Sequence, residues 1–397
     1  MIKNLSTLAT SVCCCLPSWA GDLQSELMYL RDNHPMLRAT TFAVTASEKR
    51  YTAAKAGWLP KVDVAAERGP EKIKTIPYAA GKPSPTPSET DLQRQKQSVT
   101  VTQNLFNGGR TLATTGVARI ERDIKQAERS AISQEVLLEA IVAYLQVLKN
   151  QMLISLSQIN EQTTQRQLDM EKKRVERGGG VIVDELQAAT RLQLVRERRV
   201  LYEQGMRDAL SNYEQVFGKL PELSEFQNIE IMTSRLPATI EEAMDDADEF
   251  NPRIQSAKMA SERAHKMIRL ESAGFMPNVD VVGTRNREND AGQLYRKEED
   301  SVLVKLSWNL FSGRETVSRA QAAAYDFREA AEKEKNVSNK TREAVRVAWN
   351  QYKKGIERLA LLETAVKTSQ GVMQGRKKLR DAGKETALAV LDAEVEH

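Results

Sequence analysis

The histidine and acidic side chains that could bind a metal or act on a substrate are scattered along this 397-residue sequence. His34, His265 and His397 are far apart and share no ligand spacing, so we expect no metal site. Asp63 and Asp280 hold equivalent places in two similar stretches and could pair, although strand carboxylates that face water are more often solvated than functional. No nucleophile lies in a recognisable arrangement with a base. We therefore predict that the chain is not an enzyme and binds no cofactor.

A glycine-rich run, GGGVIVDE at residues 178–185, is the next stretch that could do chemistry. It lacks the Lys-Ser/Thr pair with which a phosphate loop holds phosphates and a metal. Three glycines after a long segment free of glycine and proline instead predict the end of a helix and a reversal of the chain. Asp184 and Glu185 then suit the start of the next helix, where negative charge is favourable.

The first twenty residues differ from the rest of the chain. Lys3 is followed by a mostly apolar stretch, Leu5 to Leu16, and then by small residues around Ala20, so residues 1–20 are predicted to be a signal peptide. All three cysteines, Cys13 to Cys15, fall inside it, which leaves the mature chain without a thiol. Elsewhere no run of about twenty apolar residues exists, and we expect no transmembrane helix. Charges of both signs are mixed, with a net charge of +4, so we expect no nucleic-acid partner.

The sequence repeats itself. GWLPKVDV at residues 57–64 recurs as GFMPNVDV at 274–281, and NLFNGG at 104–109 recurs as NLFSGR at 309–314. Gly178 and Gly383 keep the second spacing of 205 residues. We therefore expect two structural repeats, residues 21–217 and 238–397, joined by a linker at 218–237.

Each repeat is predicted to contain two strands, a very long helix and a return helix. The expected strands are at about 60–68, 97–106, 277–286 and 300–311, and the expected helices after the first one of each repeat are at about 110–177, 184–217, 314–381 and 386–397. Five prolines between Arg68 and Gln97 predict a loop, since proline suits neither a helix nor a central strand. In the long helix, apolar residues with 4-3 spacing from Ile120 to Ile159 predict a coiled-coil seam.

The expected strands have one apolar and one polar face. The residues predicted to face lipid are Val99, Val101, Leu105, Val302, Val304, Leu306 and Trp308. Four such strands cannot close a barrel, and an open sheet with an apolar outer face would aggregate. Three copies of the chain would supply about twelve strands, within the range of outer-membrane barrels. Aromatic residues at the strand ends, such as Trp58 and Phe275, suit the membrane interface.

With these motifs, the whole mature chain resembles the TolC-like outer-membrane channels of multidrug efflux and type I secretion. The motifs that support the resemblance are the duplicated LPKVDV and MPNVDV, the QNLFNGG and WNLFSGR corners, and the glycine turns RGGGVIVDELQAA and DAGKETALAVLDAE. The resemblance implies a mixed α and β membrane protein, a homotrimer with one twelve-stranded barrel in outer-membrane lipid and a coiled-coil tunnel reaching into the periplasm. It also implies a periplasmic adaptor as partner and an inner-membrane ABC or proton-driven transporter as the energy source.

The resemblance implies roles for individual residues. Asp184 and Asp392 occupy places of the carboxylates that narrow the periplasmic mouth, although each could simply be a helix-capping or solvated residue. The family's basic latch residue falls at Glu385 and its tyrosine partner at Arg380, so the latch must differ here. The glycine turns that would dock the adaptor are Gly178, Gly179, Gly180 and Gly383. The corners between barrel and tunnel are Phe106, Gly108, Gly109, Phe311 and Gly313.

Two further expectations follow. A periplasmic coiled-coil adaptor, or another structural protein of an envelope complex, is the alternative to a channel, but an adaptor has one helical hairpin where this sequence predicts two. The second return helix stops at His397, equivalent to Leu192 in the first repeat. We therefore expect the sequence to be a fragment and residues 21–397 alone to assemble poorly.

Overall fold

The computed structural model contains long helices and one principal sheet. It describes residues 23–76, 78–79, 82–83, 88–223, 226, 236–290 and 295–396, so the predicted signal peptide and most of the predicted linker lie outside the described residues. The chain divides into two units. One unit comprises residues 1–38, 132–240 and 347–397, and the other comprises residues 39–131 and 241–346. The two longest helices each contribute to both units.

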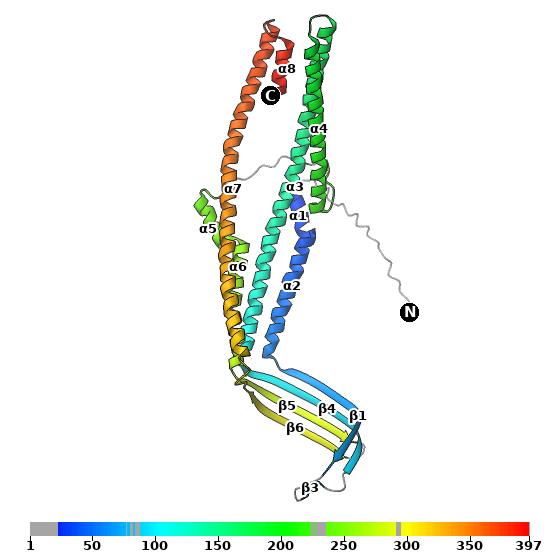
Figure 1. Ribbon diagram of the computed structural model, residues 1–397, viewed down its shortest axis with the longest axis vertical. Helices are drawn as coiled ribbons and strands as arrows, with labels where there is room; N and C mark the ends of the chain where they lie inside the picture. Colours follow the sequence, from blue (N-terminus) through cyan, green and yellow to red (C-terminus); the bar gives the residue numbers. More distant parts are fainter. Residues whose placement is uncertain are drawn as a thin grey trace, which may run out of the picture. The chain divides into compact units, whose positions relative to one another are not determined.

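A four-stranded antiparallel sheet belongs to the second of these units (Figure 1). Its order is β1 (Lys61–Thr75), β4 (Ser88–Asn107), β5 (Asn278–Asp290) and β6 (Tyr295–Ser307). Two short strands, β2 (Tyr78–Ala79) and β3 (Lys82–Pro83), pair with each other between β1 and β4 in the chain. The two repeats therefore meet at the β4–β5 pair, and β1 and β6 are the edge strands of the sheet.

The first hairpin is longer than predicted, and the predicted proline-rich loop is wrong over most of its length. β1 continues to Thr75 and β4 begins at Ser88, with Pro70 in register opposite Gln93. Proline is tolerated there because β1 is an edge strand, where a missing N–H can face away from the ladder. β6, in contrast, ends at Ser307, so Trp308 and Phe311 lie beyond the strand that was expected to contain them.

Each strand pair is preceded by two helices and a short 3₁₀ turn. The first set is α1 (Leu23–Asn33), α2 (Pro35–Lys55) and η1 (Ala56–Trp58); the second is α5 (Ile240–Phe250), α6 (Pro252–Ser272) and η4 (Ala273–Phe275). The break between the helices is capped in the same way in both sets. Asn251 Oδ1 accepts hydrogen bonds from the N–H groups of Arg253 and Ile254, and His34 Nδ1 accepts one from Met36. His34 therefore lies at a helix break, as Asn251 does in the second set.

The longest helices are α3 (Arg110–Glu176) and α7 (Glu315–Asp381), and each is followed by a return helix, α4 (Ile182–Phe217) or α8 (Ala387–Glu396). The main apolar core lies in the unit that contains α4, where Ala143 and Val147 of α3 are fully buried. There the Tyr213 ring of α4 stacks on Phe217 with ring centroids 4.1 Å apart. Tyr144 of α3 stacks on Phe226 at 4.4 Å. Burial of these aromatic rings and small side chains is what holds α4 against α3.

In the single chain, the predicted coiled-coil seam of α3 is buried only in its first part. Ile120 and Ile124 are buried, but Leu138, Met152 and Ile159 are 63%, 50% and 58% exposed. Within one chain the buried stripe changes to the face that carries Ala143 and Val147, because α1 and α4 pack on that side. The predicted exclusion of a membrane-spanning helix was also too strict, since α3 is long and apolar enough by length and composition alone. Core helices of soluble proteins meet the same criterion, and 28% of this apolar stretch is buried in the single chain.

Candidate functional site

The two helical hairpins reverse direction through the same turn. Gly178 has φ of 72°, its N–H donates to the Val175 carbonyl at 2.9 Å, and the Gly179 N–H donates to Arg174 O at 3.0 Å. In the second hairpin Gly383 has φ of 71°, and the N–H groups of Gly383 and the next residue donate to Arg380 O and Leu379 O, both at 2.9 Å. These are the paired bonds of a Schellman motif, whose left-handed position favours glycine.

The two candidate mouth carboxylates do not occupy equivalent places in their helices. Asp184 is the third residue of α4, whereas Asp392 is the sixth residue of α8. With the turns aligned on Gly178 and Gly383, the residue that corresponds to Asp184 is Ala389. The two aspartates therefore do not hold corresponding places in the two repeats, and the surroundings of each are described separately.

Asp392 joins three helices. Its Oδ1 accepts a hydrogen bond from Arg191 of α4 at 2.9 Å and another from Gln167 of α3 at 3.1 Å. The Gln167 side chain is buried, while the Asp392 side chain is 44% exposed. On its other side α8 is bound to α7, because Arg376 donates to the Ala389 carbonyl at 3.0 Å. Asp392 is thus a bridging residue between the two hairpins, a role that sequence spacing gave no reason to expect.

The other candidate latch residues are not joined to each other. Arg380 donates to its neighbour Asp381 at 2.9 Å, and Glu385 accepts a long 3.4 Å bond from the Thr386 N–H. Asp184 lies half-buried in the first turn of α4, where the helix dipole favours a carboxylate. These three side chains are near the glycine turns, as predicted, but Arg191 and Gln167 were missed. No feature of the sequence distinguishes these two side chains from others on the long helices.

At the first corner, between β4 and α3, the backbone is tightly enclosed. Gly108 has φ of 66°, and a Cβ atom at this position would lie 2.6 Å from both the Ala273 carbonyl oxygen and the Met276 Cβ. Asn107 begins the helix: its Oδ1 accepts from the Thr111 N–H at 3.2 Å. Glycine is therefore required here both by its backbone angle and by lack of space.

The second corner has the same backbone path with more room. Gly313 has φ of 60°, and nothing lies within 4 Å of the place where its Cβ would be. Arg314, which corresponds to Gly109, is the described non-glycine residue with positive φ, at 69°. Ser312 and Thr316 form a 3.1 Å hydroxyl contact where the first corner has Asn107 and its threonine. The predicted corner residues are all found at these two junctions.

One side of the sheet, the apolar face, carries small aliphatic side chains near the helices. The register places these residues on that side: Val62, Val64, Ala66, Val99, Val101, Val279, Val281, Gly283, Val302, Val304 and Leu306. Gln103, opposite Val281, is a polar residue among them. Val302 and Val304 are 79% and 72% exposed. A bulge between Asn104 and Phe106 makes Leu105 an extra residue, so that Phe106 rather than Leu105 lies opposite Val279.

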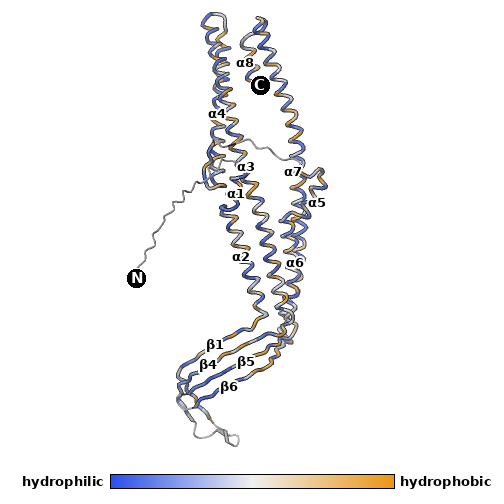
Figure 2. The backbone as a smooth tube through the Cα atoms, turned by 180° about the vertical axis from the view of Figure 1, so that it is seen from behind, coloured by the Kyte–Doolittle hydropathy of each residue, from blue (hydrophilic) through white to orange (hydrophobic). Residues whose placement is uncertain are grey.

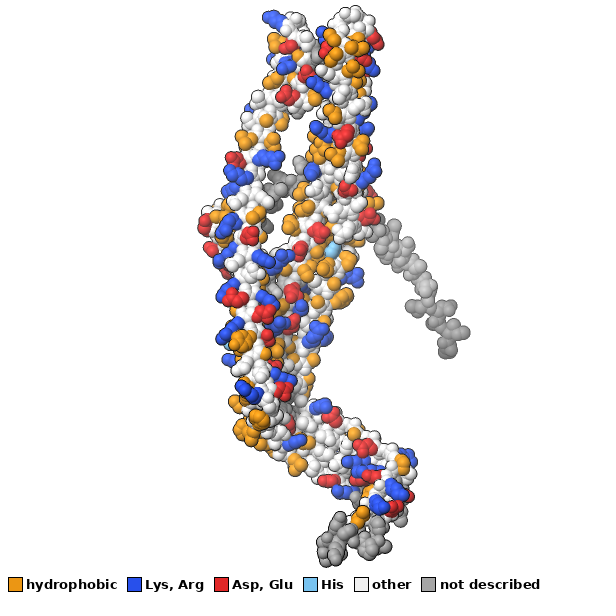
Figure 3. Space-filling view, viewed as in Figure 1, with side chains coloured by type: hydrophobic (Ala, Val, Ile, Leu, Met, Phe, Trp, Pro, Cys, Tyr) orange, Lys and Arg blue, Asp and Glu red, His pale blue; other side chains and the backbone are white. Residues whose placement is uncertain are grey.

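Aromatic and charged side chains gather at opposite ends of the sheet. Hydrophobic side chains cluster where the strands meet the helices, and charged side chains become frequent toward the far end (Figure 3). Trp308 and Phe311 are exposed at the helix end, and the Trp308 indole N–H donates to Phe275 O at 3.1 Å. β5 and β6 change in the same direction, from hydrophobic next to the helices to hydrophilic at the far end (Figure 2).

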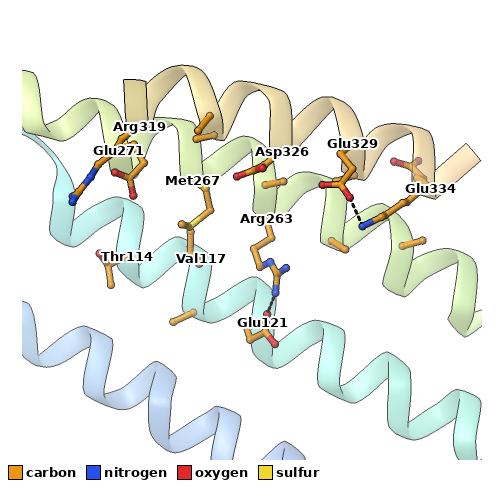
Figure 4. Close-up of a pocket in the computed structure, with 18 of the residues that line it drawn as sticks. Thr114, Val117, Glu121, Arg263, Met267, Glu271, Arg319, Asp326, Glu329 and Glu334 are labelled. Atoms are coloured by element: carbon orange, nitrogen blue, oxygen red, sulfur yellow. Dashed lines mark hydrogen bonds and ion pairs between the residues drawn. The ribbon is translucent and has the colours of Figure 1, made fainter. Parts of the chain in front are cut away.

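A groove of about 940 Å³ lies among α2, α3, α6 and α7 within the unit that contains the sheet (Figure 4). Alanines such as Ala260 and Ala323 form its floor, and charged residues of both signs line its sides. Arg263 of α6 points toward Glu121 of α3 and forms an ion pair with it. No cluster of three metal-binding side chains occurs among the residues that the structure describes. The groove thus combines small apolar side chains with charges of both signs.

Comparison with known proteins decides the family. The model of the outer membrane efflux protein family matches residues 28–219 and 243–396. The chain belongs to the outer membrane efflux protein family. The two matched segments coincide with the two sets of helices and strands described above, and the predicted resemblance to TolC-like channels is confirmed.

Individual relatives agree with this assignment. The chain is 22% identical over 400 residues to the outer membrane protein TolC of Vibrio cholerae, which covers 98% of this chain and 86% of that protein. It is 26% identical over 270 residues to the alkaline protease secretion protein AprF of Pseudomonas aeruginosa, covering 66% of this chain and 56% of that protein.

Solved structures show the same fold. The outer-membrane channel OprN has a TM-score of 0.78 at 18% identity, covering 94% of this chain and 83% of that one. The outer membrane protein VceC of Vibrio cholerae has a TM-score of 0.77 at 15% identity, covering 94% and 89%. The prediction of a mostly helical chain with a sheet, in an outer-membrane efflux or secretion channel family, is confirmed at this level.

Proposed function

We propose that this protein is the outer-membrane exit duct of a tripartite export system and works as a homotrimer. The sheet is the main support for this proposal, because it has an exposed apolar face and two unpaired edges, β1 and β6. Three copies joined edge to edge would form a closed twelve-stranded barrel with no free edge and with the apolar face toward lipid. The outer membrane, named in the family description, is the bilayer that such a barrel fits.

A stripe on α3 supports association of several copies. Leu138, Leu145, Met152 and Ile159 recur every seventh residue and are all exposed in the single chain. Such a spacing is a coiled-coil seam without its partner helix. In a trimer, a helix from a second copy of this chain would cover this stripe. The helices of the three copies would then form a closed periplasmic tunnel.

The internal organisation of the proposed duct follows the two repeats, residues 21–217 and 238–397. Each would cross once from barrel to tunnel at a glycine corner and return at a Schellman turn. The turns at Gly178 and Gly383 would be the tips that dock on a periplasmic adaptor. An inner-membrane ABC or proton-driven transporter would then provide the energy, so the duct itself would need neither a catalytic site nor a cofactor.

Two classes of cargo fit the proposed duct. AprF is named for the secretion of a protease, whereas the family description refers to efflux. Both classes fit a lumen lined by the polar face of the sheet, where Asp63, Thr100, Thr284 and Ser301 form one cross-strand row. A row of small hydroxyl groups and a carboxylate provides hydration without selecting a shape.

The mouth at the glycine turns would be held shut by the Asp392 bridge. Asp392 binds Arg191 and Gln167 of one hairpin while its own helix binds α7, so separation of the hairpins must break this ion pair. Asp184, which has no such bridge among the described residues, would remain as the carboxylate that faces passing ions. The two aspartates would therefore act differently, one on opening and one on selectivity.

Planar-bilayer conductance tests both parts of this proposal. The wild-type protein should form cation-permeable channels. Asp392→Asn or Arg191→Gln should each raise the open probability about two- to fivefold, because each removes a partly exposed ion pair that stabilises the closed state. The double variant should add little to either single one, because both remove the same bond. Asp184→Asn should lower cation selectivity and leave opening unchanged.

The possible contrary results are distinct. A wild-type protein that stays a water-soluble monomer and never conducts would overturn the exit-duct proposal. Conducting channels whose opening is unchanged by Asp392→Asn and Arg191→Gln would overturn only the bridge. Equal loss of selectivity in Asp184→Asn and Asp392→Asn would mean that both carboxylates line the mouth.

A further inference from the structure

The apolar face ends, on the side away from the helices, along a line that is oblique to the strands. Following each strand away from the helices, the apolar residues on this face end at Arg68 on β1, Gln97 on β4, Arg285 on β5 and Asp300 on β6. Gln103 of β4, opposite Val281, is a polar residue within the apolar part of the face. Gln97 lies opposite Ala66, two residues before Arg68, and Arg285 lies opposite Val99, two residues beyond Gln97. Asp300 lies directly opposite Arg285. The boundary thus moves by four residues from β1 to β6.

This slant gives the orientation of the membrane plane on the sheet. Four residues correspond to about 13 Å along a strand, and three strand spacings to about 14 Å across the sheet. The boundary therefore makes an angle of about 40° with the rows of paired residues, which is the usual tilt of strands in membrane barrels. With the strands tilted by that amount, the boundary is parallel to the membrane surface.

The apolar face is short when it is measured along the membrane normal. On β6 it extends from Trp308, just below the strand, to Val302, which is about 20 Å along the strand and about 15 Å along the normal. On β4 it extends over a similar length, from Phe106 to Val99. Barrels of this type carry an apolar band about 25 Å tall. The band on this sheet is shorter by about 10 Å.

Charged pairs occupy the place where the missing part of the band would be. Arg285 Nε lies 3.6 Å from Asp300 Oδ1, and Arg287 Nε lies 3.5 Å from Glu298 Oε1, all on the apolar side of the sheet. Further along β6, Arg296 lies on the same side and forms an ion pair with Glu298. An arginine that faces lipid costs about 2–4 kcal/mol at the bilayer midplane and about 0–1 kcal/mol at the interface.

We propose that the sheet fits a hydrocarbon layer of about 15–20 Å, with lipid headgroups reaching the Arg285–Asp300 pair. This inference rests on the barrel proposed above. Its lipid partner is a bilayer that is thin, or thinned around the protein, and whose polar groups solvate Arg285 and Arg287. The aromatic residues at Trp308 and Phe106 mark the other interface. The far half of the long β1–β4 hairpin then stands in water.

Reconstitution in bilayers of graded thickness tests the proposal. The purified full chain is folded into phosphatidylcholine vesicles with acyl chains of about 10 to 18 carbons, and the midpoint of thermal dissociation of the oligomer is measured in each. The midpoint should be highest in the shortest chains that still form stable bilayers and fall steadily as the chains lengthen. A maximum at about 16–18 carbons would overturn the proposal, whatever the variants below show.

A matched pair of double variants makes the test specific to the face. Arg285→Val with Asp300→Val adds one apolar row, about 5 Å along the normal, and should move the optimum to longer chains. Thr284→Val with Ser301→Val changes the adjacent row on the polar face and should move nothing. Equal displacement by both pairs would contradict the inference, because thickness would then not be sensed by the apolar face.

The outcome also separates this inference from the proposed function. Conducting oligomers that prefer thick bilayers would overturn the short band and leave the exit duct intact. Failure to insert or conduct in every bilayer would overturn both.

Discussion

The two helical hairpins begin with the same turn but are packed very differently. α3 is covered by the 36-residue α4, and their contact buries Tyr213 and Val216 almost completely. α7 has the same length as α3, yet its return helix has 10 residues, and Leu359, Leu361 and Leu362 are more than half exposed. The turn is fixed by a few local backbone bonds, whereas burial depends on which helices pack beside α3 and α7 in the single chain. Identical local signals therefore do not imply equal contributions to stability.

The largest expected effect is at the core of the first hairpin. Tyr213→Ala should destabilise the chain by about 3–4 kcal/mol, because it leaves a cavity against Phe217 and Phe226. Leu361→Ala on α7 is the matched change and should cost less than about 0.5 kcal/mol in the single chain. Thermal unfolding followed by helical circular dichroism measures both.

The same pair of variants can sharpen the comparison in the assembled protein. If Leu361→Ala is neutral in the single chain but costly in the oligomer, another copy covers α7. If it is as costly as Tyr213→Ala in both forms, the contrast between the hairpins is wrong.

A smaller difference is expected between the two corners. Gly108→Ala should cost about 2–3 kcal/mol, since its Cβ would collide with Ala273 O and Met276 in addition to the strain of a positive φ. Gly313→Ala meets no atom within 4 Å and should cost only the backbone strain, about 1 kcal/mol. The midpoint of urea unfolding compares them. Equal losses would show that the first corner relaxes and that steric enclosure is not what distinguishes it.

The smallest effect is expected at the ion pair between Asp248 and Arg342 in the second repeat. Arg342 donates to Asp248 with Nε 3.1 Å from Oδ2, and this hydrogen bond lowers the pKa of the Asp248 carboxyl. A lowered folded-state pKa contributes stability above the unfolded value, and this stability is lost as the pH falls through the folded pKa. Asp248→Asn should therefore lower the melting temperature by about 1 °C near pH 7, and this difference should disappear as the pH falls through the lowered pKa of the folded Asp248 carboxyl. A difference that persists in acid would mean that the amide disturbs packing instead.

Much of this architecture could be predicted because its signals are local or periodic. The ends of α3, α4 and α7 fall within two residues of the expected bounds, since glycine turns and proline-free runs define them. The faces of the strands followed from alternation. The proline-rich hairpin was missed because edge position, which makes Pro70 tolerable, is a property of the sheet and not of the strand.

The candidate site was less predictable, for a different reason. The glycines of both turns and both corners were found, because positive φ limits the residue type strongly. The Asp392 bridge was not, since Gln167, Arg191 and Asp392 are separated by up to 225 residues and any surface helix carries such side chains. The buried stripe of α3 was misplaced beyond Ala131 because two apolar faces with similar spacing compete on one helix. Only the partner helix decides between them.

The bulge at Leu105 has a consequence for the sidedness of the whole junction. If the strand had no bulge and Leu105 were paired, Leu105 would lie opposite Val279, and Phe106 would lie opposite Asn278 on the polar side. The bulge thus decides which face of the sheet receives the last side chains of β4 before the helix. Deletion of Leu105 would remove the bulge and leave Phe106 opposite Val279, whereas a regular ladder that kept Leu105 would turn the aromatic ring to the polar face of the sheet. At this junction the number of residues in the strand matters as much as their identity.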